Sequence, residues 1–178
     1  MNNEKEKSID DMLFGKNKKI VIPILVLSLI FIFSFRAFVI ERIVVSGESM
    51  MPNFQNDNVV FIKKFSNAYE RNDVVVIRVN GKNVIKRIIG MPNETIQIKD
   101  DGYVYIDGNK LENDYGYATN YKGCAEQKIT IGEDEYFVMG DNRDNSSDSR
   151  DWNTIAESQI KGEVFLRIFP YWEIEIYQ

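Results

Sequence analysis

The chain has 178 residues, of which 44% are hydrophobic and 12% aromatic, and it carries a formal net charge of −5 at pH 7. This composition suits one packed domain with a short additional segment, and the negative charge argues against a nucleic-acid partner. The chain contains no histidine and only one cysteine, Cys124. These counts exclude a Ser-His-Asp triad, a Cys-His dyad, histidine-ligated metal sites and an intramolecular disulfide, so Cys124 is interpreted as an apolar filler or an unpaired thiol.

The N-terminal part of the chain has the pattern of a membrane anchor. Residues 1–19 are polar and carry both charge signs, and we expect them to form a cytoplasmic tail. Residues 20–35 then contain no charge. As a helix this run would extend about 24 Å, slightly less than the roughly 30 Å core of a lipid bilayer. Because Arg36 can extend its side chain toward water, we expect the transmembrane helix to occupy residues 20–40.

A cleavable signal peptide is the alternative interpretation of this segment. It requires small residues at positions −3 and −1 of a cut site, and no such pair follows Phe33, so an uncleaved anchor is favoured. Five lysines precede the apolar run, whereas only Arg36 and Arg42 follow it closely. The positive-inside rule therefore predicts a single-pass protein of the cytoplasmic membrane, with its N-terminus in the cytoplasm and residues 41–178 extracytoplasmic.

After the anchor the pattern is mostly β, with β-branched or aromatic runs bounded by turn residues. The predicted strands are Phe38–Val45, Asn58–Phe65, Asp73–Val79, Val84–Ile89, Thr95–Lys99, Tyr103–Ile106, Lys128–Ile131, Tyr136–Met139 and Gly162–Phe169. Asp107-Gly108 is typical of a hairpin turn. Residues of about 100–135 are expected to form a small excursion, and the only helix signal in this domain is a possible short turn at Thr154–Gln159.

Ser49 lies on a turn that could hold a reactive hydroxyl. It stands between Gly47, which tolerates unusual backbone conformations, and Pro52, which restricts its own backbone and that of the preceding residue. A hydroxyl fixed in this way is suited to act as a nucleophile. The alternative is an ordinary serine that caps a loop. Because histidine is absent, a lysine is the leading candidate for its base.

Lys86 is the lysine whose surroundings suit a base. If Val84–Ile89 forms a strand, Lys86 shares one face with Val84 and Ile88, both branched aliphatic residues. Desolvation by such neighbours lowers the pKa of an ammonium group and makes the neutral amine available. The alternative is an edge-strand lysine that points into water and prevents aggregation.

A third segment of interest is the polar run after the strand predicted at Tyr136–Met139. It comprises residues 140–151, in which carboxylates and arginines alternate. A calcium-binding loop fails on spacing, because Ser146 stands where the glycine should be and Trp152 where the glutamate should be. A network of hydrogen bonds and ion pairs fits better, and a solvated loop is the alternative.

With these segments in this order, the chain resembles the bacterial type I signal peptidases of the Gram-positive branch, which are membrane-anchored Ser-Lys serine endopeptidases. The resemblance runs from the apolar run to the C-terminus. It rests on residues 49–52, 57–63, 86–92 and, most specifically, on the Gly-Asp-Asn-Arg-Asp-Asn-Ser-x-Asp-Ser-Arg motif of residues 140–150. It implies a coiled antiparallel sheet or partial barrel of the signal-peptidase and LexA-like type after a single transmembrane helix.

The resemblance also implies roles for individual residues. Ser49 would be the nucleophile and Lys86 the general base. Ser146 would donate or accept a hydrogen bond that orients the lysine amine, and Asp148 and Arg150 would form an ion pair that supports this serine.

The same resemblance implies an oxyanion hole that includes the backbone N–H of Ser49. Some relatives add a side-chain hydroxyl two residues before the nucleophile, where this chain has Gly47. The implied reaction removes signal peptides from secreted preproteins at the outer face of the cytoplasmic membrane through an acyl-enzyme, with no cofactor and no metal.

The apolar residues near the proposed dyad are expected to form the substrate pocket: Ile43, Val45, Met50, Phe54, Val84 and Ile85. Such a pocket would require small residues at positions −3 and −1 of the preprotein. Two alternatives stay open. The chain could be a catalytically silent, membrane-tethered β module that binds secreted chains, or another self-processing Ser-Lys peptidase of the LexA type.

Overall fold

The structure is a computed structural model that describes residues 18–66, 68–112, 115–168 and 174–177. The chain divides into two compact units, residues 1–39 and residues 40–178. Most of the expected tail, residues 1–17, lies outside the described residues.

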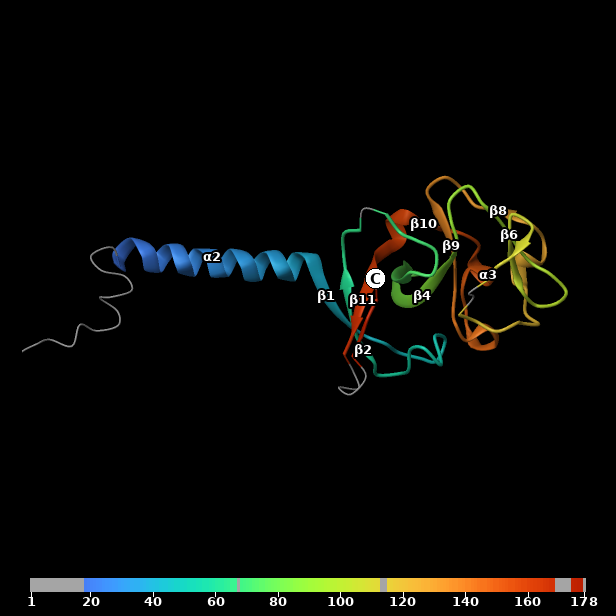
Figure 1. Ribbon diagram of the computed structural model, residues 1–178, viewed down its shortest axis with the longest axis horizontal. Helices are drawn as coiled ribbons and strands as arrows, with labels where there is room; N and C mark the ends of the chain where they lie inside the picture. The colour runs from blue at the N-terminus through green and yellow to red at the C-terminus, as the bar shows by residue number, and fades with distance from the viewer. Residues whose placement is uncertain (1–17, 67, 113–114, 169–173, 178) are drawn as a thin grey trace, which may run out of the picture. The chain divides into compact units, whose positions relative to one another are not determined.

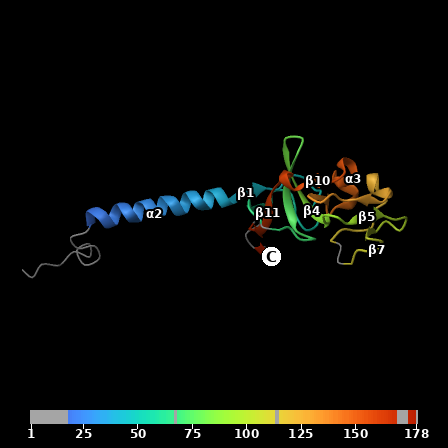
Figure 2. The same cartoon turned by 90° about the horizontal axis from the view of Figure 1, so that it is seen from above.

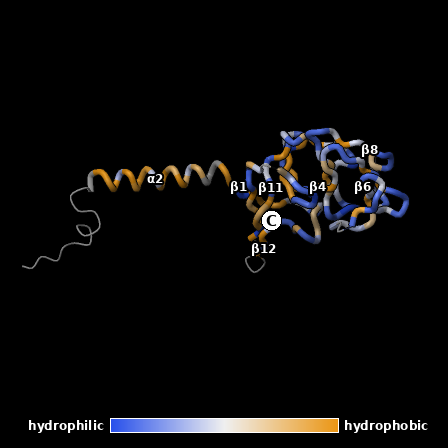
Figure 3. The backbone as a smooth tube through the Cα atoms, turned by 45° about the horizontal axis from the view of Figure 1, so that its top comes forward, coloured by the Kyte–Doolittle hydropathy of each residue, from blue (hydrophilic) through white to orange (hydrophobic). Residues whose placement is uncertain are grey.

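The first unit contains helix α2, Lys18–Val39, which is drawn in blue in Figure 1. Most of its apolar side chains are exposed, from 47% at Leu25 to 72% at Phe33. Figure 3 shows the hydrophobic colour along most of this helix. Among the described residues, no helix meets both the length and the apolarity that a membrane span requires. The helix continues through residue 39, so the predicted strand at Phe38–Val45 begins two residues later than expected.

The second unit is mostly β, as predicted, and all pairings between its described strands are antiparallel. Its larger sheet has eight strands in the order β1-β2-β11-β3-β4-β9-β10, with β12 paired to β11. These strands are β1 Ile40–Val44, β2 Val59–Lys63, β3 Val74–Val79, β4 Lys82–Gly90, β9 Glu135–Met139, β10 Ile155–Ala156, β11 Ile160–Arg167 and β12 Glu175–Ile176. Figure 1 shows β1, β2 and β11 together at one end of this unit.

A second sheet has four strands in the order β7-β6-β5-β8. They are β5 Thr95–Ile98, β6 Val104–Ile106, β7 Asn109–Lys110 and β8 Ile129–Thr130. Figure 2 shows β5 and β7 at the end of the unit away from β1. The hairpin at Asp107-Gly108 is confirmed, because Ile106 pairs with Asn109 and both turn residues have positive φ, 50° and 85°. This is the backbone that a two-residue hairpin requires.

Three clusters of buried side chains form the core. The first lies under β1, β2 and β3 and includes Met50 and Phe54. The second includes Val75, Ile77 and Ile88, with Val84 packed against it. The third joins the two sheets through residues such as Ile89, Ile96 and Phe137. Ile85 belongs to the first cluster and Ile88 to the second, which is the alternation expected of a strand buried on both faces.

The short helical elements differ in part from the sequence-based expectation. A helical turn, α3, forms at Ser149–Trp152, inside the segment predicted to be an irregular polar loop. The short turn expected at Thr154–Gln159 is confirmed in its second half by a 3-10 helix, η4, at Glu157–Gln159, which follows the short strand β10. Two further 3-10 helices are η2, Gly123–Glu126, and η3, Arg143–Asn145. The helix at Ser149 begins there because Asp148 and Asp151 form a capping box.

Candidate active site

The turn that carries Ser49 follows β1 and is fixed at both ends. Before it, the backbone N–H of Val45 donates to the carbonyl of Asn58 at 2.8 Å. After Ser49, the side chains of Met50 and Phe54 are 1% and 0% exposed in the first core cluster. The N–H of Phe54 donates to the carbonyl of Met50 at 2.8 Å, which closes the turn. Gly47 has φ +96°, a conformation that favours glycine at this position.

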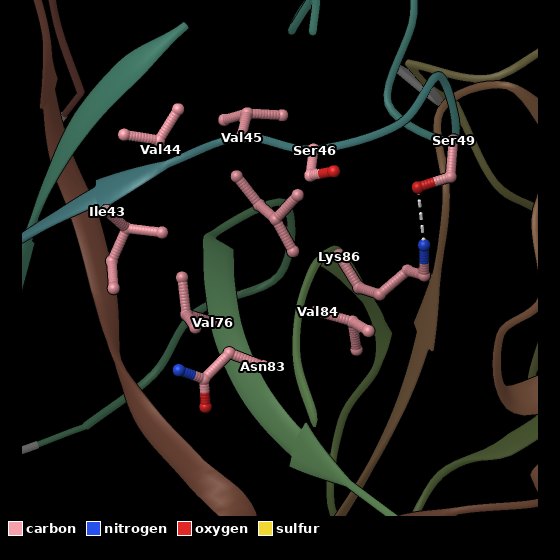
Figure 4. Close-up of a pocket in the computed structure, with 10 residues that line it drawn as sticks. Ile43, Val44, Val45, Ser46, Ser49, Val76, Asn83, Val84 and Lys86 are labelled. Carbon is pink, nitrogen blue, oxygen red and sulfur yellow. Dashed lines mark hydrogen bonds between the residues drawn. The ribbon is translucent and has the colours of Figure 1, made fainter. Parts of the chain in front are cut away.

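Lys86 lies in β4, opposite Val75 of β3, and its side chain is only 3% exposed. Its Nζ donates a hydrogen bond to Ser49 Oγ at 2.6 Å (Figure 4). Burial lowers the pKa of Lys86 to about 8, against the opposite influence of the Asp148 and Asp141 charges. A lysine with this pKa supplies a neutral amine at only mildly alkaline pH, and that amine can accept a proton from the hydroxyl it contacts.

Asp148 and Arg150 form a fully buried ion pair in the polar segment. The Nε and Nη2 atoms of Arg150 donate to the two carboxylate oxygens of Asp148, each at 2.8 Å. The same guanidinium donates to the carbonyls of Arg143 and Tyr121 at 2.6 and 3.0 Å. Asp148 also accepts the backbone N–H of Gly140 at 3.0 Å. The charges of Asp148 and Arg150 are thus satisfied by each other and by neighbouring backbone groups, as a bidentate arginine pair requires when it is buried.

A second buried ion pair, Arg87–Asp141, was not predicted. Arg87 donates from Nε and Nη2 to Asp141 at 2.8 and 2.6 Å, and Asp141 also accepts the side-chain amide of Asn53 at 2.9 Å. These contacts connect the residue next to Lys86 with the turn of Ser49. The sequence contained a signal for this pair, because an arginine inside a run of aliphatic residues needs a buried carboxylate.

The hydrogen bond predicted between the Ser146 hydroxyl and the Lys86 amine does not form in the structure. Ser146 Oγ is buried and has no hydrogen-bond partner among the described residues. The hydroxyl nevertheless lies close to the site, because a Cβ added to Gly140 would meet Ser146 Oγ at 2.2 Å and the carbonyl of Ser49 at 2.4 Å. Gly140 therefore permits the polar segment to approach the turn, and only the predicted hydrogen bond to the amine is wrong.

A small pocket of about 100 Å³ opens beside Ser49 and Lys86. Of the six residues expected to form a substrate pocket, four line it: Ile43, Val45, Val84 and Ile85. Met50 and Phe54 do not, because both side chains turn inward to the core. The sequence-based expectation missed four lining residues, Val44, Ser46, Val76 and Asn83, which come from β1, the segment after it, β3 and β4 (Figure 4).

The backbone amides near Ser49 differ in their partners. No acceptor in the described part of the chain takes the N–H of Ser49. By contrast, the N–H of Gly47 donates to Asn56 Oδ1 at 3.0 Å. The Ser49 amide can thus donate to an oxygen outside the protein. Within the described residues, no three His, Cys, Asp or Glu side chains gather in a way that could hold a metal ion.

Comparisons with known proteins find a matching family model and several relatives. A family model described as signal peptidase, peptidase S26, matches residues 18–171. A signal peptidase I of Bacillus amyloliquefaciens is 35% identical over 98% of this chain and 98% of its own length. Signal peptidase I S of Bacillus subtilis strain 168 is 33% identical over 88% and 89%. A solved signal peptidase I from Enterococcus faecalis V583 covers 56% of this chain and 98% of its own, with 32% identity and a TM-score of 0.47.

The burial of Lys86 predicts how its replacement changes stability. Its pKa is about 8 in the folded chain and is normal, near 10.5, after unfolding. Below pH 8 both states are protonated, so the native state bears the whole cost of the buried charge, and stability rises as the pH approaches 10.5. Lys86→Met should therefore raise the melting temperature by roughly 5 °C at pH 7 and by less at pH 10.

Lys82→Met is the matched control, because Lys82 lies exposed at the start of the same strand. Thermal unfolding of the three proteins at both pH values is the measurement. A Lys86→Met variant less stable than the wild type at pH 7, or a difference that does not shrink at pH 10, would contradict the cost assigned to the buried ammonium.

Proposed function

Because the chain belongs to the signal peptidase family, peptidase S26, we propose that it cleaves signal peptides from secreted preproteins with Ser49 as the nucleophile and Lys86 as the general base. The observation that carries this proposal is the 2.6 Å hydrogen bond between Lys86 Nζ and Ser49 Oγ at a lysine that is 3% exposed. A serine hydroxyl in contact with a desolvated amine is the activated pair that acyl transfer requires.

The proposed reaction has two halves. In the first, the neutral amine of Lys86 takes the proton of Ser49 Oγ while this oxygen attacks the scissile carbonyl. The backbone N–H of Ser49 donates to the oxyanion that forms, and its lack of an acceptor among the described residues supports this assignment. The ammonium then gives its proton to the leaving amine, and an acyl-enzyme remains. In the second half, a water molecule gives a proton to Lys86 and attacks the acyl carbon, and Ser49 Oγ takes this proton back from Lys86 as the acyl group leaves.

The two buried ion pairs support this chemistry from outside the dyad. Asp148–Arg150 holds the polar segment beside Gly140, where the carbonyl of Ser49 makes a 3.0 Å hydrogen bond with the N–H of Asn142. Arg87–Asp141 connects β4 with the Ser49 turn. Pairs of this kind keep the nucleophile and the base at a fixed separation, on which rate depends steeply.

We propose further that α2 anchors the chain in the cytoplasmic membrane, with the N-terminus in the cytoplasm and the β domain on the extracytoplasmic side. The support is the uncharged run at residues 20–35, the exposed apolar side chains of the helix and the five lysines that precede this run. This orientation would place the pocket on the side to which signal-bearing chains are exported.

The dyad is tested by single and double substitutions. Ser49→Ala and Lys86→Ala should each reduce processing of a signal-bearing precursor by roughly 10⁴-fold or more, and the double variant should be little worse, because the two residues act as a unit. The measurement is kcat/KM with the full chain in detergent, with Lys82→Ala as the exposed control on the same strand. Substantial activity in Lys86→Ala would show that another group is the base.

The pKa of Lys86 predicts the pH dependence. The amine acts only when it is deprotonated, so kcat/KM should rise with pH and level off above the pKa of about 8. The profile should be recorded from pH 6 to pH 10 at temperatures well below unfolding. A rate that falls between pH 6 and pH 9 would be incompatible with a lysine base.

The pocket predicts the choice of substrate. Its walls are mostly aliphatic and the amine of Lys86 lies beside it, so we expect it to favour a small apolar side chain over a bulky or charged one. In an extended substrate the residues at −1 and −3 point to the same side, whereas −2 points away. Changing Ala at −1 or −3 to Leu should therefore lower kcat/KM about 100-fold.

The same change at −2 is the control and should alter kcat/KM by no more than a few-fold. Efficient cleavage after Lys or Glu at −1 would contradict the proposed use of this pocket. Binding of precursor with no cleavage by the wild type would instead favour the catalytically silent module.

A further inference from the structure

The C-terminal strand β12 lies against the larger sheet close to the Ser49 turn. It pairs with the end of β11, with Leu166 opposite Ile176 and Arg167 opposite Glu175. The backbone N–H of Tyr177 continues this pairing by donating to the carbonyl of Phe165 at 3.0 Å. Figure 3 shows β12 beside β11. The family model matches residues 18–171, so this strand lies beyond the matched residues.

Tyr177 covers the buried end of the Ser49 turn. Its ring stacks on Phe54 with centroids 5.3 Å apart and an interplanar angle of 26°. Phe54 is fully buried and closes the turn through its hydrogen bond to the carbonyl of Met50, the residue after the nucleophile. Stacked aromatic pairs contribute energy beyond their buried area and restrict the orientation of both rings. Tyr177 therefore limits the movement of Phe54.

Arg167 holds the same turn from β11. Its guanidinium donates from Nη1 to the carbonyl of Asn53 and from Nη2 to Glu175 at 2.8 Å, and it lies 5.5 Å from the centre of the Phe54 ring. The hydroxyl of Tyr177 donates to the same oxygen of Glu175 at 2.8 Å. Burial and the Glu175 charge raise the pKa of Tyr177, so this hydroxyl stays protonated and keeps donating.

Asn53 is consequently held from two sides. Its carbonyl accepts from Arg167, and its side-chain amide donates to Asp141, which is paired with Arg87 next to the proposed base. One continuous set of contacts runs from the C-terminal strand through the Ser49 turn to β4.

We propose that Tyr177 and Arg167 are positioning residues for the nucleophile, and that the C-terminal strand clamps the Ser49 turn at the correct distance from Lys86. This proposal rests on the proposed function. Neither residue lines the pocket, so neither is expected to contact the −1 or −3 side chain. Their effect is on the geometry of Ser49 Oγ, and a displacement of about 1 Å can lower a rate by ~100-fold.

The test compares Tyr177→Ala with two further variants of the full chain. Tyr177→Phe keeps the stacked ring and loses only the hydrogen bond to the exposed Glu175, and Tyr117→Ala removes a tyrosine that is 68% exposed. We expect kcat to fall about 10-fold in Tyr177→Ala with KM within two-fold of the wild type. Tyr177→Phe should keep most of the activity, and Tyr117→Ala all of it.

Arg167→Lys provides a second, independent variant that preserves the charge. A lysine cannot bridge the Asn53 carbonyl and Glu175 with a planar fork, so kcat should fall here as well. All assays are run about 15 °C or more below the melting temperature measured for each variant. A mildly destabilised variant then stays folded during the assay. The rate at which a serine-directed covalent probe labels Ser49 should fall in parallel with kcat.

One result would overturn the proposal: Tyr177→Ala lowers the melting temperature but leaves kcat and the labelling rate unchanged. Tyr177 would then have a purely structural role. A rise in KM alone would also overturn it. Failure of the proposed function would look different from failure of this proposal. In that case the wild-type chain would not process the precursor, or Ser49→Ala would process it normally, whatever the C-terminal variants do.

Discussion

The burial of the Lys86 amine is the constraint on which the rest of the site depends. A lysine in water is protonated at neutral pH and cannot act as a base. With 3% exposure and a pKa of about 8, Lys86 gives up its charge far more readily. The only described group that its Nζ contacts by a hydrogen bond is Ser49 Oγ. The strand that buries this amine therefore also aims it at the proposed nucleophile.

The buried ion pairs around Lys86 protect this low pKa. Asp141 and Asp148 are the two carboxylates whose charges raise the pKa of the lysine, whereas Arg150 lowers it. Each carboxylate is already paired, Asp141 with Arg87 and Asp148 with Arg150. If either stood alone, it would serve as a counter-ion and favour the ammonium form. The pairs thus position the polar segment. They also weaken the effect of these two carboxylates on the pKa of Lys86.

Local patterns predicted a large part of the fold, and the structure places the two candidate residues Ser49 and Lys86 in contact. The alternation of branched and polar residues located most strands, because side chains of a strand point to opposite faces, and Asp107-Gly108 located a hairpin because few dipeptides tolerate positive φ twice. The site was harder to predict from the sequence than the strands, because its residues are far apart in the chain. The absence of histidine favoured a lysine as the partner of a serine, and the resemblance to type I signal peptidases then pointed to Ser49 and Lys86.

The sequence by itself therefore determined the β pattern, the apolar helix, and the residue types available for catalysis, all of which depend on near neighbours in the chain. Only the tertiary structure decided which side chains meet. It joined Arg87 to Asp141 across 54 positions, left the Ser146 hydroxyl without a hydrogen-bond partner among the described residues, and turned Met50 and Phe54 into the core. It also brought Tyr177 onto Phe54. These contacts depend on sheet order and on packing between distant segments, and spacing along the chain does not encode the direction in which a side chain on a turn will point.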